Sequence, residues 1–92
     1  MRRAAKVDGN HAAIVAALRA AGASVVSLAA LGKGVPDLLV CTSRWCRLVE
    51  VKMPGGKLTP DQVRFQAGWQ GPPVVIVTSP VDAVTWLGEI EG

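Results

Sequence analysis

The sequence lacks the features that mark membrane, secreted and repeat proteins. No apolar run reaches the roughly 18 to 20 residues of a membrane span, and the start, MRRAAKVDGN, lacks the apolar run of a signal peptide. The two cysteines are too few for a disulfide framework, and their C-x4-C spacing has no second pair of zinc ligands nearby. No repeat, low-complexity tract or linker is visible. We therefore expect one intracellular, cytoplasmic domain over residues 1–92 with no membrane contact.

The chain is small, apolar and mildly basic. A domain of 92 residues hides only roughly 60 to 65% of the surface that its unfolded chain exposes. The mean hydropathy of +0.34 is high for a small soluble monomer, so we expect a homodimer that covers apolar surface. The formal net charge of +3 suits a polyanion partner, although many basic surfaces are only solvated.

Apolar periodicity predicts the order helix, strand, hairpin, helix, strand, helix. A strand that is joined to the next through a helix usually forms a right-handed parallel crossover. We therefore expect an α+β fold with a small mixed four-stranded sheet flanked by helices. The expected elements are a helix over 8–21, with Asp8 or Asn10 as N-cap, strands over 23–28 and 72–79, a hairpin over 37–52, and helices that begin after Thr59 and Ser79.

The stretch LTPDQVRF carries a strong signal for a helix start. Thr59 occupies the N-cap, Pro60 the first helical position and Gln62 the third, which is a capping-box arrangement. The stretch SPVDAV repeats this logic near the end of the chain. Both helices therefore have well-defined expected N-termini.

The hairpin, GVPDLLVCTSRWCRLVEVK, places charges on strands that are otherwise apolar. If its turn has an even number of residues and is centred on 43–44, Cys41 faces Cys46 and Asp37 faces Glu50. Directly paired side chains have Cβ atoms about 4.5 to 5.5 Å apart, and like charges in such pairs are destabilising. The pattern therefore makes poor sense as scaffold alone.

A divalent cation between Asp37 and Glu50 would remove this repulsion. Lys52 shares a strand face with Glu50, and could hold a phosphate oxygen or orient an attacking water. Carboxylate oxygens suit Mg²⁺ or Mn²⁺, and the chemistry that this set serves is phosphodiester hydrolysis. The alternative is structural: Asp37 accepts backbone hydrogen bonds at the strand entrance, and E-V-K lies on a solvated strand.

At these residues the chain resembles the VRR-NUC type of the PD-(D/E)xK nuclease superfamily. The resemblance rests on GVPDLLV, LVEVK and MPGGKLTPDQVRF and covers residues 7–80. It implies a restriction-endonuclease-like α-β-β-β-α-β core, here with an extra C-terminal helix. It also implies one or two Mg²⁺ or Mn²⁺ ions and cleavage of DNA.

The resemblance also assigns roles to single residues. Asp37 and Glu50 would be catalytic metal ligands, with the carbonyl of Val51 completing the metal shell, and Lys52 would be the catalytic lysine. Gln62 matches a glutamine common in this group, and the capping box is an equally good reading of it.

The first helix departs from the family pattern. Such nucleases often carry a glutamate there that adds to the metal site, whereas this chain reads VDGNHAAIV. Asn10 or His11 is the candidate for that place, as a neutral ligand or through a water. A histidine at a helix start is, however, more often a surface cap.

Further residues are candidates for contacts with DNA or with a second copy. Lys33, Lys57 and Arg64 could meet the phosphate backbone. Trp69 and Trp86 could stack on bases, and a dimer contact is the commoner use of such side chains.

Together these features predict a metal-dependent DNA endonuclease. Standalone domains of this kind resemble dimeric Holliday-junction resolvases, which favours branched or structured DNA as substrate. The alternative is a catalytically weak nucleic-acid-binding module, or a nuclease subunit of a larger phage or repair assembly; a phage or prophage origin is compatible with either.

Overall fold

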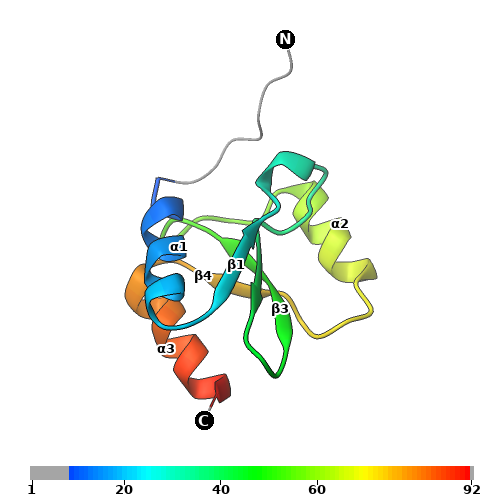
Figure 1. Ribbon diagram of the computed structural model, residues 1–92. Helices are drawn as coiled ribbons and strands as arrows, with labels where there is room; N and C mark the ends of the chain where they lie inside the picture. Colours follow the sequence, from blue (N-terminus) through cyan, green and yellow to red (C-terminus); the bar gives the residue numbers. More distant parts are fainter. Residues whose placement is uncertain (1–8, 92) are drawn as a thin grey trace.

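The computed structural model describes residues 9–91, and its elements follow the predicted order (Figure 1). This order confirms the α+β, restriction-endonuclease-like core with an additional C-terminal helix. Asp8, one of the two expected N-caps, lies outside the described residues. A short 3-10 helix that was not predicted follows the first strand. The elements are α1 (His11–Ala20), β1 (Ser24–Ser27), η1 (Ala29–Leu31), β2 (Leu38–Cys41), β3 (Cys46–Val51), α2 (Pro60–Gly68), β4 (Val75–Val77) and α3 (Pro80–Glu91).

The four strands form one mixed sheet in the order β1-β2-β3-β4. The first three are antiparallel, and β3 pairs in parallel with β4 through the crossover that contains α2. In the β2–β3 hairpin Cys41 faces Cys46, and the Thr42 N–H donates to the Trp45 carbonyl at 2.8 Å. The turn is therefore centred on residues 43–44, as the sequence predicted.

One face of the sheet carries the hydrophobic core. Alternate residues of the strands point to this face, where α1 and α3 cover them and pack against each other. The helices contribute residues four apart, Ile14 and Leu18 from α1 and Ala83 and Leu87 from α3. The main strand residues of this core are Val25, Leu38, Val40, Val49, Val51 and Val77.

Helix α2 stands on the other side of the sheet (Figure 1) and buries none of its residues. Its N-terminus is approached closely by the loop that precedes β2. A Cβ on Gly34 would lie 2.2 Å from the carbonyl oxygen of Asp61, and the φ of Gly34 is +79°. Only glycine allows this approach, so Gly34 fixes the distance between the loop and α2.

The tryptophans divide between interior and surface. Trp86 packs edge-on against Trp45, with ring centroids 5.6 Å apart, and both lie against the core. Trp69 stacks on Phe65 at 5.4 Å and keeps 41% of its surface exposed. Of the two tryptophans proposed for base or dimer contacts, Trp86 is thus packed against the core of its own chain, whereas Trp69 remains at the surface.

Cys41 and Cys46 form a disulfide across the hairpin, with Cα atoms 4.0 Å apart. The expectation that these cysteines do not hold zinc agrees with this pairing. Disulfides persist mainly in oxidising compartments, and the intracellular location stays a prediction. Within residues 9–91, no helix combines the length and apolar character of a membrane span.

Removal of the disulfide should lower stability modestly. The bond joins residues only five apart, and chain-entropy arguments give about 2 kcal/mol for so short a loop. We expect the double variant Cys41→Ser, Cys46→Ser to melt about 10 °C below the parent, as measured by circular dichroism. A reductant should lower the melting temperature of the parent to that of the double variant. An unchanged melting temperature of the parent in reductant would contradict the presence of the bond.

Candidate active site at the end of the β2–β3 hairpin

Asp37 joins three strands at the entrance of β2. Its Oδ2 accepts the N–H of Val51 at 2.9 Å, while its main-chain carbonyl accepts the N–H of Leu28 at 2.6 Å. The paired residues of the hairpin end at Leu38 and Val49, so the Val51 N–H lies beyond the last rung and needs another acceptor. The Asp37 side chain therefore completes the ladder, which agrees with the structural alternative stated for it. Its other oxygen, Oδ1, makes no hydrogen bond to the described residues.

Glu50 lies on the α2 side of the sheet because its neighbours, Val49 and Val51, point into the core. Only 1% of its surface is exposed, which is rare for a carboxylate unless the group is paired. Its Oε2 accepts a hydrogen bond from Nε2 of Gln62 at 3.1 Å. Asp37 precedes β2 opposite this position, so the hairpin brings the two carboxylate residues to one end.

Gln62 forms the predicted capping box and also contacts Glu50. Its Oε1 accepts the N–H of Thr59 at 2.9 Å, and its own N–H donates to Oγ1 of Thr59 at 3.2 Å, which completes the capping box. Its Nε2 donates to Glu50. Oε1 faces a donor and Nε2 faces an acceptor, so the orientation of the amide follows from its partners.

Lys52 directly follows β3, and its backbone remains tied to the sheet. Its N–H donates to the Val77 carbonyl at 3.0 Å, and its carbonyl accepts from Nδ2 of Asn10 at 3.1 Å. Strand alternation puts the Lys52 side chain on the face of Glu50. The ammonium forms no ion pair or hydrogen bond with residues 9–91.

Asn10 was expected either to cap α1 or to replace the family glutamate. It stands at the N-cap position, as expected, but its side chain makes no capping hydrogen bond. Instead, Nδ2 donates to the carbonyls of Lys52 and of Thr78, the latter at 2.7 Å. The sequence carried no signal for this contact because the partners are 42 and 68 residues away.

A divalent cation suits the donors at this end of the hairpin. Within the described part of the chain no three His, Cys, Asp or Glu side chains gather as a metal site, so His11 does not join Asp37 and Glu50 in such a group. The two carboxylates and the Val51 carbonyl nevertheless form an all-oxygen set, which is the donor chemistry of Mg²⁺ and Mn²⁺.

The three basic residues proposed for DNA contacts lie in the loop before β2, in the loop before α2 and on α2 itself. Lys33 and Lys57 are exposed, and Lys33 adopts a left-handed φ of +56°, which is uncommon for a residue other than glycine. The close contact of Gly34 with Asp61 holds this loop beside α2. Arg64 pairs with Asp61 on the surface, an exposed ion pair that contributes little to stability.

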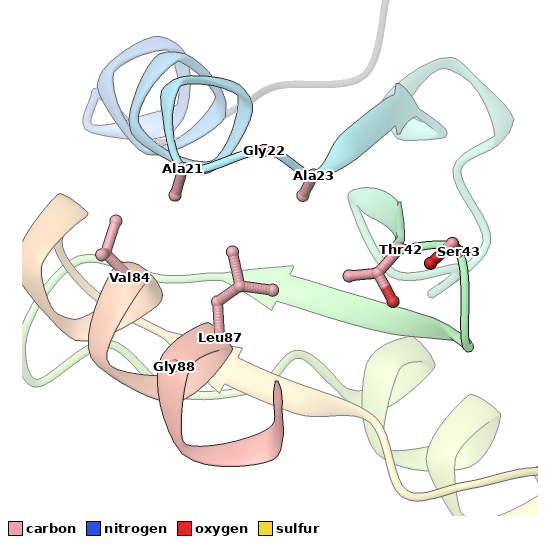
Figure 2. A pocket seen from close by; sticks show the side chains of 8 residues that line it. All are labelled: Ala21, Gly22, Ala23, Thr42, Ser43, Val84, Leu87 and Gly88. Atoms are coloured by element: carbon pink, nitrogen blue, oxygen red, sulfur yellow. The ribbon is translucent and has the colours of Figure 1, made fainter. Parts of the chain in front are cut away.

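A pocket of about 490 Å³ lies elsewhere, between the end of α1, the hairpin turn and α3. Figure 2 shows Val84 and Leu87 on its α3 side and Thr42 and Ser43 on its turn side. The turn is the opposite end of the hairpin from Asp37 and Glu50. The pocket is therefore separate from the candidate active site.

The fold and the residues at the hairpin end define a class: a nuclease-type α+β domain with an Asp, a Glu-x-Lys and a helix-borne Gln. The model of the VRR-NUC domain matches residues 4–70 of the chain. The chain therefore belongs to the VRR-NUC family, a family of nuclease domains. The match contains every predicted site residue and ends before β4 and α3. None of the curated proteins compared with the chain matches it.

The hydrogen bond to Val51 changes the expected effect of substitutions at Asp37. Repulsion from Glu50 alone would make a neutral variant as stable as the parent or slightly more so. Since the buried Val51 N–H depends on Oδ2, Asp37→Ala should instead cost about 1 to 3 kcal/mol in the presence of chelator. Asp37→Asn keeps an acceptor and should cost less. Urea unfolding measures both; an Ala variant as stable as the parent would contradict this role.

The two roles of Gln62 can be separated by a pair of variants. Gln62→Glu keeps an acceptor for the capping box but removes the donor to Glu50 and adds a second carboxylate there. Thr59→Ala removes the cap alone, at about 1 kcal/mol. We expect the first variant to lose nuclease activity and the second to keep it, in assays well below both melting temperatures. If Gln62→Glu cleaved DNA as fast as Thr59→Ala and the parent, the Gln62–Glu50 hydrogen bond would have no part in the reaction.

Proposed function

We propose that the protein is a Mg²⁺- or Mn²⁺-dependent DNA endonuclease that hydrolyses phosphodiester bonds in branched or structured DNA such as Holliday junctions. One observation carries the proposal: the hairpin of a VRR-NUC chain brings Asp37, Glu50 and Lys52 to one end. Gln62 adds a hydrogen bond that holds the buried carboxylate.

Each of these residues has a distinct role in the proposed reaction. Asp37, Glu50 and the Val51 carbonyl would hold the divalent cation, which would polarise the phosphate and lower the pKa of a water. Lys52 binds a phosphate oxygen or orients the attacking water. Gln62 fixes the direction of the Glu50 carboxylate. Their positions on or directly beside strands and on a capped helix limit the loss of alignment that loops would allow.

Lys33, Lys57 and Arg64 provide the proposed contacts with the DNA backbone. All three are exposed near the hairpin end or on α2, and Arg64 would exchange its surface pairing with Asp61 for a phosphate. Phosphate contacts release counterions, so binding should weaken steeply as salt rises.

A homodimer is part of the proposal. The mean hydropathy of +0.34 is matched by large apolar side chains that a single copy leaves exposed, namely Val26, Leu31, Met53, Val63, Trp69, Ile76, Val81 and Val84. Burial of such side chains between subunits would remove them from water. Sedimentation velocity at micromolar concentration tests this; a monomer alone would count against it.

The alternative is a module that binds nucleic acid without cutting it, alone or as a subunit of a larger assembly. The first turn of α1 contains no acidic residue, and His11 is not gathered with the two carboxylates. Incubation with Mg²⁺ or Mn²⁺ and linear, flapped and four-way DNA separates the two functions. Cleavage supports the nuclease, whereas binding without cleavage in either ion supports the module.

Lys52→Ala should reduce cleavage to a low residual rate and leave ion binding intact. An ion that binds only the folded state stabilises it by about 2.7 kcal/mol at a concentration of 100 Kd. We expect Mn²⁺ to raise the melting temperature of Lys52→Ala and parent equally, because the ammonium is not a ligand. Lys57→Ala is the matched control, with weaker DNA binding and unchanged kcat. Cleavage by Lys52→Ala at the parental rate would exclude the assigned role.

A further inference from the structure

Asn10 directs its side chain away from the helix that it precedes. Asparagine at an N-cap normally accepts a hydrogen bond from the first turn of its helix, worth about 1 kcal/mol. Here the helix receives no such bond, and Oδ1 is buried without a hydrogen-bond partner among residues 9–91. Nδ2 instead donates to two carbonyls, of Lys52 and of Thr78. Both partners are acceptors, so the amide nitrogen must face them.

These carbonyls lie where the parallel strands β3 and β4 end. The last paired residues are Val51 and Val77, and the Lys52 N–H still donates to the Val77 carbonyl. Asn10 then bridges the carbonyls of Lys52 and Thr78, one from each strand. The side chain thus supplies one additional rung to a ladder that would otherwise end at Lys52.

The consequence for Lys52 is that both of its main-chain polar groups are bound. Its N–H is held by β4 and its carbonyl by Asn10. A backbone fixed at both groups keeps its extended direction, which maintains the side chain on the face of Glu50. The polypeptide can turn away only afterwards, at residues 54–55.

We propose that Asn10 is a positioning residue for Lys52, which holds the lysine backbone so that its ammonium meets the scissile phosphate. This inference rests on the proposed function and goes beyond it, because it assigns Asn10 neither a cation nor a capping role. A misplacement of about 1 Å at a reacting group can cost about 100-fold in rate. Asn10→Ala should therefore lower kcat about 10- to 100-fold and leave KM within about twofold.

Asp82→Ala is the matched control. Asp82 Oδ2 accepts the Thr78 N–H at 2.8 Å, so its loss also removes a side-chain contact to the Thr78 backbone without touching Lys52. It should lower the melting temperature but keep kcat within about twofold, in assays well below that temperature. A matching loss of kcat in Asp82→Ala would reduce Asn10 to a stabilising residue and overturn the inference.

Asn10→Asp separates positioning from two other roles. Aspartate has nearly the same volume but faces both carbonyls with acceptors only, so its kcat should be no higher than that of the alanine variant. Parental kcat in Asn10→Asp would mean that only packing matters. Higher Mn²⁺ affinity together with higher kcat would mean that position 10 is a metal ligand. Either result overturns the inference.

A double-mutant cycle and hydrogen exchange complete the test. In a Lys52→Ala background, Asn10→Ala should cause no further loss of residual kcat, because it acts through Lys52; an additive loss indicates a separate role. Exchange of the Lys52 amide, measured by NMR, should accelerate in Asn10→Ala but not in Asp82→Ala, with the Val40 amide as reference. Unchanged exchange at Lys52 overturns the inference without reference to activity.

The failure of the inference can be told apart from the failure of the proposed function. If the parent cleaves no DNA, or if Lys52→Ala cleaves as the parent does, the nuclease assignment falls and the positioning role falls with it. If cleavage requires Lys52 but not Asn10, only the inference is overturned.

Discussion

The burial of the Glu50 carboxylate is the constraint on which the rest of the site depends. A charged group that is nearly inaccessible to water is tolerated only with a hydrogen-bonding partner. That partner is the Gln62 amide, which requires α2 to begin at the correct distance from the sheet. The capping box sets where the helix begins. Gly34 has no side chain, so the loop before β2 can approach the N-terminus of α2. One buried charge thus accounts for several choices elsewhere in the sequence.

Much of this arrangement could be read from the sequence because the signals are local. The register of the hairpin follows from a two-residue turn and from the alternation of apolar side chains, and it is observed as expected. The start of α2 follows from three residues, Thr59, Pro60 and Gln62. The parallel pairing of β3 and β4 follows from the helix between them.

The contacts that could not be predicted join distant parts of the chain. Asn10 was expected to cap α1 because N-cap preferences depend only on neighbouring residues. Its hydrogen-bond partners directly follow β3 and β4, which only the folded chain brings close to Asn10. Trp86 looked free because its partner, Trp45, is in the hairpin. The bond from Asp37 to Val51 required knowledge of where the β2–β3 ladder ends, which is two residues before Val51.

The cross-link between Cys41 and Cys46 has a consequence for the far end of the hairpin. Strand register belongs to the whole ladder, and a slip of one residue would exchange the two faces of β3. Glu50 would then point among the core residues, and a valine would take its place beneath α2. A covalent bond between one pair of opposite residues excludes every such slip. The disulfide therefore locks, from the other end of the strand, the register that sets which side chain Gln62 meets.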